Sequence, residues 1–119
     1  MFGEVLGRIL REVPGVRSVT VMGFDGIAIE SVESAGADGN EAAAAVEIAA
    51  VTSQLRRAAE GLGAGDVHEV ALETDGMTTL LRPLTSEYCL AVTLAAGGLT
   101  GKARYLMRVS APMIAAELA

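Results

Sequence analysis

One glycine-rich stretch has the composition of a phosphate-binding loop. Residues 96–103 read Ala-Gly-Gly-Leu-Thr-Gly-Lys-Ala and stand between a predicted strand and a predicted helix. A phosphate-binding loop needs glycine at its first position and Ser or Thr directly after the lysine, because that hydroxyl is a ligand of Mg²⁺. Alanine occupies both positions, as Ala96 and Ala103. The stretch is therefore interpreted as a strand-to-helix turn with Lys102 on the surface, in preference to a nucleotide site.

Few other side chains could perform chemistry. His68 is the only histidine, and no nearby motif supplies partners for a metal site or a nucleophile–base pair, so a surface or edge-strand role is favoured. Cys89, the only cysteine, alternates with Leu90 and Val92 in a predicted strand, which favours a buried structural thiol. No spacing pairs the carboxylates for acid–base catalysis. We therefore expect no catalytic residue, no metal ligand and no cofactor, and a protein that is not an enzyme.

A basic patch lies near the start of the last predicted helix. It consists of Lys102, Arg104 and Arg108, and the two arginines stand one helical turn apart on one face. Two interpretations stay open. The patch is either a solvated face of an acidic protein or a docking patch for the acidic surface of a partner.

The composition restricts the class of protein. The chain has 119 residues, of which 51% are apolar, and we expect a single domain spanning residues 1–119. Its formal net charge of -6 argues against a nucleic-acid binder, which relies on clustered Lys and Arg. The longest nearly apolar run, residues 42–51, contains Glu47 and is too short to span a bilayer. Without a recognisable signal peptide, we expect a cytoplasmic protein that does not insert into membranes.

Hydrophobic periodicity and turn residues divide the chain into eight elements. Pro14 and Gly15 end the first helix, Asp25-Gly26 predicts a hairpin, and Asn40 is a predicted N-cap. The predicted helices span residues 2–12, 41–62 and 100–118, and the predicted strands span residues 16–24, 27–32, 67–74, 77–84 and 88–95. Short connections make the sheet largely antiparallel, which is an α+β arrangement.

The central helix is apolar on two sides. At about 100° per residue, one side should cover the sheet and the opposite side should be charged if it faced water. The side predicted to cover the sheet carries Ala44, Ile48, Val51, Leu55, Ala59 and Leu62. The opposite side carries Ala42, Ala43, Val46, Ala49, Ala50 and Ser53. A second copy related by a two-fold axis would cover this side, although alanine is also a strong helix former that tolerates exposure.

Three short stretches carry a resemblance to a known family. They are residues 13–16 (Val-Pro-Gly-Val), residues 24–29 (Phe-Asp-Gly-Ile-Ala-Ile) and residues 98–104 (Gly-Leu-Thr-Gly-Lys-Ala-Arg). In this order and spacing, the sequence resembles the Roadblock (dynein light-chain) family over nearly its whole length. The resemblance implies a layered, profilin-like fold, in which a five-stranded antiparallel sheet has the central helix on one face and both terminal helices on the other.

The resemblance also implies a function. Family members dimerise through the central helices and the third strand, which adds Val70 and Leu72 to the predicted dimer interface. They act as adaptors and GTPase regulators, and the bacterial MglB-like branch stimulates a small Ras-like GTPase in polarity and motility systems. The partner-facing surface there includes the paired central helices, so the candidate contacts are Gln54, Arg56, Arg57 and Glu60. The alternative is a small-molecule sensor domain, which would need a cavity between the sheet and the terminal helices.

Overall fold

The computed structural model describes residues 2–119, and its elements follow the predicted order of helix, two strands, helix, three strands and helix. The elements are α1 (Gly3–Glu12), β1 (Val16–Gly23), β2 (Ala28–Glu33), α2 (Asn40–Gly61), β3 (Val70–Glu73), β4 (Met77–Pro83), β5 (Tyr88–Ala95) and α3 (Thr100–Leu118). Within the described residues, no helix is long and apolar enough to cross a bilayer.

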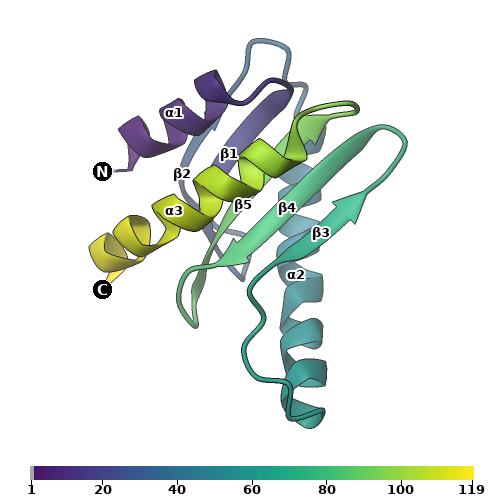
Figure 1. Cartoon of the computed structure of the whole chain (residues 1–119), viewed down its shortest axis with the longest axis vertical. Helices are drawn as coiled ribbons and strands as arrows, with labels where there is room; N and C mark the ends of the chain where they lie inside the picture. Colours follow the sequence, from purple (N-terminus) through teal and green to yellow (C-terminus); the bar gives the residue numbers. More distant parts are fainter. Residues whose placement is uncertain (1) are drawn as a thin grey trace.

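The five strands form one antiparallel sheet in the order β2-β1-β5-β4-β3 (Figure 1). The central strands β1 and β5 are buried along almost their whole length, because side chains of both strand faces meet a layer of helices. The strands at the two edges, β2 and β3, are mostly exposed. Among residues 2–119, no strand pairs with the outer edge of β3.

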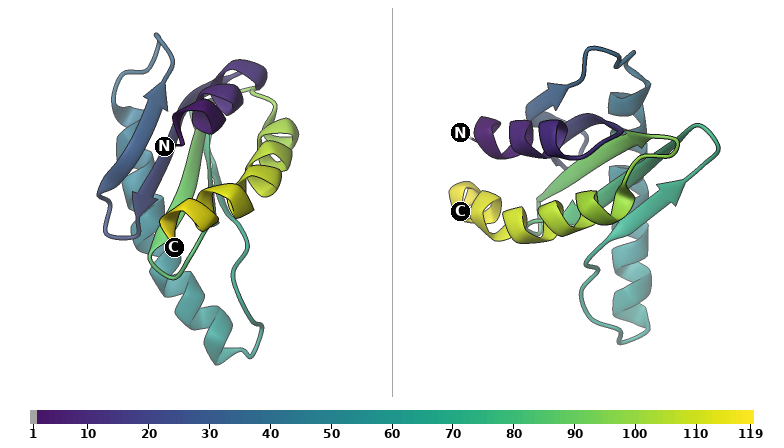
Figure 2. Two further views of the ribbon diagram at one scale, coloured as in Figure 1. Left: turned by 90° about the vertical axis from the view of Figure 1, so that its left-hand side faces the viewer. Right: turned by 45° about the horizontal axis from the view of Figure 1, so that its top comes forward.

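Helices cover both faces of the sheet, as predicted. Side chains that alternate with a period of two separate into two cores, one on each face. Val19, Leu90 and Val92 belong to the core beneath α1 and α3, whereas Cys89 and Ala91 belong to the core beneath α2. Figure 2 shows the two terminal helices side by side on one face and α2 on the other.

The start of α2 differs from the sequence prediction. Asn40 is the first helical residue, and Gly39 occupies the N-cap position with a φ of 94°, so the assignment of Asn40 as N-cap was wrong. Asp38 explains the difference, because its Oδ1 accepts a hydrogen bond of 3.0 Å from the backbone N–H of Asn40. This bond also lowers the pKa of Asp38. Glu41 Oε1 in turn accepts a 3.1 Å bond from the Asp38 N–H, and its Oε2 lies 2.9 Å from Arg17 Nε.

The face of α2 that contacts the sheet is rotated from the predicted one. Ala49, assigned to the outer face, is fully buried against the sheet, so its assignment to a dimer interface was wrong. Val51 and Leu55, expected to cover the sheet, have exposed fractions of 45% and 41%. The buried side chains of α2 are Glu41, Ala45, Ile48, Ala49 and Thr52, and the small side chains of Ala45 and Ala49 favour close packing of this face on the strands.

The other predicted interface residues keep an outward position. Ala42, Ala43, Val46 and Ala50 lie on the outer side of α2 or at its margin, and Ser53 is half-buried. Strand β3 is shorter than predicted, because residues 64–69 form a connection outside the sheet.

The buried thiol generates a prediction about alkaline stability. Burial raises the pKa of Cys89 to about 12, against an ordinary value of 9.0, and the nearby Arg56 offsets only part of this effect. The unfolded thiol ionises as the pH rises above 9.0, whereas the folded thiol stays protonated. The protonated thiol therefore makes its full contribution to the free energy of unfolding below pH 9.0. This contribution falls between pH 9.0 and about pH 12, by no more than about 1.4 kcal/mol per pH unit.

We expect urea unfolding between about pH 8 and about pH 11 to give a steeper loss of stability for the wild-type protein than for Cys89→Ala. The variant starts from a lower free energy of unfolding because it leaves a small cavity. Parallel pH dependences of the two proteins would contradict the prediction.

Candidate functional site

The glycine-rich stretch after β5 packs against the turn that follows α1. Gly15 has a φ of +92°, and a Cβ atom there would lie 2.5 Å from the Cα of Gly98. Two backbone bonds join the turns: the N–H of Ala95 donates to the carbonyl of Gly15 (2.8 Å), and the N–H of Leu99 donates to the carbonyl of Pro14 (3.1 Å). The glycines therefore allow two turns to approach closely.

The same turn has few amides to offer to a phosphate group. Phosphate-binding loops hold their ligand with backbone N–H groups that point into an open cradle. Here the N–H of Gly98 donates to Ala95, that of Leu99 to Pro14, and that of Thr100 to Gly98. These three donors are already used within the chain. The structure thus agrees with a connecting turn in this stretch.

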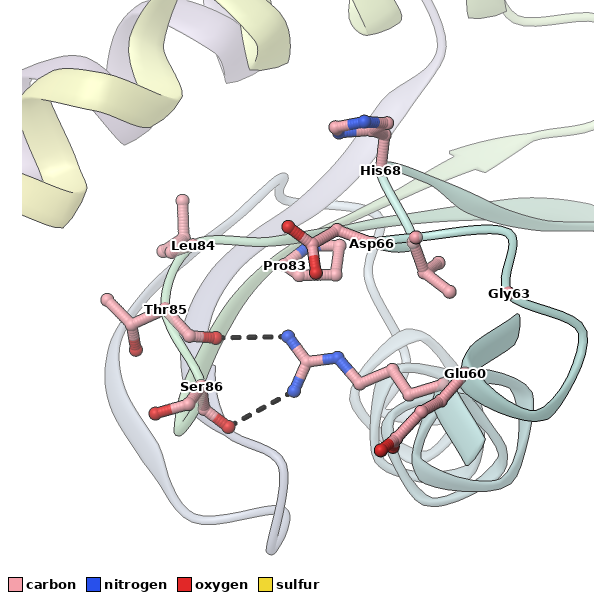
Figure 3. Close-up of a pocket in the computed structure, with 11 residues that line it drawn as sticks. Glu60, Gly63, Asp66, His68, Pro83, Leu84, Thr85 and Ser86 are labelled. Carbon is pink, nitrogen blue, oxygen red and sulfur yellow. Dashed lines mark hydrogen bonds between the residues drawn. The ribbon is translucent and has the colours of Figure 1, made fainter. Parts of the chain in front are cut away.

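A pocket of about 840 Å³ lies at the C-terminal end of α2 (Figure 3). It opens between this helix, the connection to β3 and the turn between β4 and β5. Its lining residues are Arg56, Glu60, Gly63, Gly65, Asp66, Val67, His68, Pro83, Leu84, Thr85 and Ser86. His68, which the sequence places only as a surface or edge-strand residue, is exposed and borders this pocket.

Arg56 builds one wall of the pocket. Its Nη2 donates to the carbonyl oxygen of Thr85 (3.0 Å) and its Nη1 to that of Ser86 (3.1 Å), as the dashed lines in Figure 3 mark. The guanidinium carbon also lies 4.0 Å from the centre of the Phe24 ring. Arg56 therefore ties α2 to the β4–β5 turn and to the end of β1, and its donors point into the chain.

The pocket contains few groups that could perform chemistry. Glu60, Asp66 and His68 are its titratable side chains besides Arg56. Figure 3 shows Glu60 and His68 at opposite ends of the cluster. Throughout residues 2–119, no group of three His, Cys, Asp or Glu side chains is placed to hold a metal ion. The arrangement presents hydrogen-bonding groups on a concave surface.

The predicted contact residues fall on two separate surfaces. Gln54, Arg57 and Glu60 are exposed on α2, on one side of the sheet. The basic patch lies on α3, on the other side. Its three residues, Lys102, Arg104 and Arg108, are exposed, and Arg104 Nε lies 2.9 Å from Glu69 Oε2. The chain thus has two candidate interaction surfaces.

The sequence matches a known domain family. A model of the Roadblock/LC7 domain family matches residues 1–94. The chain belongs to this family. Among solved structures, this Roadblock domain is similar to MglC from Myxococcus xanthus, with 39% sequence identity, 98% of each chain covered and a TM-score of 0.69.

Two further structures share the fold at lower identity. The Roadblock/LC7 domain from Streptomyces avermitilis is 23% identical, with 97% of this chain and 95% of that chain covered and a TM-score of 0.81. The gliding protein MglB from Thermus thermophilus is 21% identical, with 98% of this chain and 89% of that chain covered and a TM-score of 0.83. A comparison with curated proteins found no match.

The contact between the two glycine turns predicts a difference between two alanine substitutions. Both Gly15 and Gly97 have positive φ, but only a Cβ at Gly15 meets backbone atoms. We expect Gly97→Ala to lower the free energy of unfolding by about 1 kcal/mol, from backbone strain alone. Gly15→Ala should lower it by about 3 kcal/mol or more, since the turns must also separate. Equal losses in urea unfolding would show that close approach is not the reason for Gly15.

The contacts of Arg56 predict that its substitution destabilises the fold more than substitution of the neighbouring Arg57. Arg56→Met removes two hydrogen bonds and the contact with Phe24, and should lower the free energy of unfolding by about 1–2 kcal/mol. Arg57→Met, at an exposed position, is the matched control and should change it by less than about 0.5 kcal/mol. Thermal unfolding of both variants measures the difference. A larger loss at Arg57 would contradict this assignment of roles.

Proposed function

We propose that this Roadblock domain is a non-enzymatic homodimeric adaptor or regulator that binds a small Ras-like GTPase and modulates its GTP hydrolysis. The proposed setting is a cytoplasmic polarity, motility or signalling system. The observation that carries the proposal is an apolar surface left open where α2 meets the outer edge of the sheet, in a chain of this family.

The edge strand β3 supports self-association. Val70 and Leu72 share one face of the strand because side chains alternate, and Val70 packs against the core beneath α2. Leu72 lies on the same face with an exposed fraction of 44%. An edge strand of this kind offers free N–H and C=O groups, and pairing with the same strand of a second copy would satisfy them.

The exposed side of α2 continues this surface. Val46, which is 39% exposed, lies on the flank of α2 beside Gly26, away from β3. Val51 and Leu55, which are exposed by 45% and 41%, share the other flank, and α2 contacts β3 within the chain. A second copy on a two-fold axis would bury these side chains together with Leu72, since an isologous interface uses one patch twice. We propose this surface, together with the exposed alanines of α2, as the dimer interface.

The paired α2 helices of the two copies would form the surface that binds the GTPase. Gln54, Arg57 and Glu60 are exposed on α2 and supply polar contacts for the GTPase. Regulation of this kind needs a different affinity for the two nucleotide states of the partner, and it needs no catalytic residue in the adaptor. Arg56 serves as a positioning residue that holds the β4–β5 turn beside them.

A small-molecule sensor domain would require a cavity between the sheet and the terminal helices. The layer between the sheet and the terminal helices is filled by buried side chains, among them Leu6, Ile9, Leu106 and Met107, each exposed by 4% or less. The pocket of about 840 Å³ lies elsewhere, at the end of α2. The adaptor role is therefore the function we propose.

A single exposed valine tests the dimer and its consequence. We expect the wild-type protein to be a dimer by light scattering, and Val51→Asp to be a monomer, because a charge would be buried within the proposed interface. Ile29→Asp is the matched control, since Ile29 is 43% exposed on the opposite edge strand β2. It should remain dimeric.

The same three proteins are then added to Ras-like GTPases encoded near the gene of this chain. The wild type and Ile29→Asp should bind one nucleotide state at least about fivefold more tightly than the other and change the rate of GTP turnover. Val51→Asp should lose both effects. Absence of binding and of any rate change with all such GTPases would reject the proposed function, and a monomeric wild type would reject the dimer.

A further inference from the structure

The outer side of α3 carries an apolar stripe that the proposed function does not use. Tyr105, Val109 and Met113 follow one another at intervals of four residues, so they lie on one face of the helix. Their exposed fractions are 54%, 44% and 56%. The side facing the sheet is filled by Ala103, Leu106, Met107, Ser110, Ala111 and Ile114, all buried. The apolar side chains of the stripe therefore do not contribute to the core beneath α3.

The charges beside the stripe have the sign opposite to that of the whole chain. Lys102, Arg104 and Arg108 oppose a single acidic residue of the helix, Glu117, in a chain of net charge -6. Arg108 lies 5.7 Å from the Tyr105 ring centre, measured from its guanidinium carbon. Neither Lys102 nor Arg108 forms an ion pair with any described residue. Cationic groups thus remain available along the stripe.

The stripe lies away from the proposed dimer interface. α3 packs on the face of the sheet opposite to α2, as both views in Figure 2 show. A partner on α3 would leave the exposed side of α2 and the edge of β3 accessible. The two surfaces can therefore be occupied together, and a partner on α3 does not depend on the proposed function.

We infer that α3 docks an acidic amphipathic helix of a partner protein. The helix would pack apolar side chains on Tyr105, Val109 and Met113 and place carboxylates beside Arg108 and Lys102. From Tyr105 to Met113 the stripe is about 12 Å long at 1.5 Å per residue, which suits two to three turns of a helix. Ion pairs at its rim would set the orientation and raise the rate of association.

A membrane surface fits these charges less well. A flat anionic surface would meet the whole face, which includes α1, where Glu4 and Glu12 balance Arg8 and Arg11 and where Arg8 pairs with Glu12. Each Lys or Arg near such a surface contributes only about 1 kcal/mol, and α1 adds no net positive charge to that of α3. A single helix contacts only the narrow basic and apolar strip of α3. The charge distribution therefore favours a protein helix.

The test selects ligands from a displayed library of helical peptides of about 16 residues, a length that covers the stripe. We expect the enriched sequences to carry apolar residues three or four apart with Asp or Glu beside them. The affinity of one such peptide, measured by fluorescence anisotropy, should fall at least tenfold for Val109→Asp and for Arg108→Glu. Ile29→Asp, with a similarly exposed residue on β2, should retain the wild-type affinity.

Charge reversal sharpens the test. A peptide with lysine in place of its acidic residues should bind Arg108→Glu more tightly than it binds the wild type. Circular dichroism confirms that the variants fold, and Met113→Asp replaces Val109→Asp if that variant does not. Three results would overturn the inference: enriched peptides without the acidic amphipathic pattern, an affinity that neither Arg108→Glu nor the folded Asp variant of the stripe changes, or Arg108-dependent sedimentation with vesicles of phosphatidylserine and phosphatidylcholine in place of peptide binding.

Discussion

A sheet whose central strands are apolar on both faces is the constraint on which this structure depends. Strands β1 and β5 bury side chains toward both sides, so neither face can meet water. Three helices meet that requirement, with α1 and α3 on one face and α2 on the other. Because apolar burial is the main favourable contribution to folding, this division of the helices follows directly from the strand composition.

The coverage is unequal, and the inequality creates the candidate dimer interface. Two helices cover one face, but α2 alone covers the other, and it packs through small side chains such as Ala45 and Ala49. The larger residues Val51 and Leu55 are displaced to its exposed margin, on the side of the sheet that ends at β3. A helix that buries only a narrow face against its sheet therefore leaves apolar surface for another chain.

Two features that suggest ligand or partner binding in the sequence make contacts within the chain in the structure. Gly98 belongs to a stretch that resembles a ligand loop in composition, yet it meets Gly15 and lets two backbone segments approach at the end of the sheet. Arg56 stands in the predicted partner surface, yet its guanidinium is engaged by Thr85, Ser86 and Phe24. In both cases the residues hold neighbouring segments of the chain in place.

The sequence alone predicted the order of elements, the antiparallel sheet and the placement of the helices on both faces. The order of elements follows from local periodicity and turn residues, which are visible along the chain, and the placement of the helices came from the family resemblance. The sequence also indicated that Cys89 is buried, and the structure confirms it. The spacing of Tyr105, Val109 and Met113 was equally readable, but it gained meaning only once the other side of α3 was known to face the sheet.

The tertiary structure decided which face of α2 is buried, where that helix begins and what Arg56 contacts. A helix that is apolar on two sides has no unique inward face in its sequence, and the choice depends on how the helix packs on the strands. Likewise, the bonds of Arg56 join residues 29 and 30 positions apart along the chain. Such long-range contacts depend on the relative positions of whole elements, which no local pattern specifies.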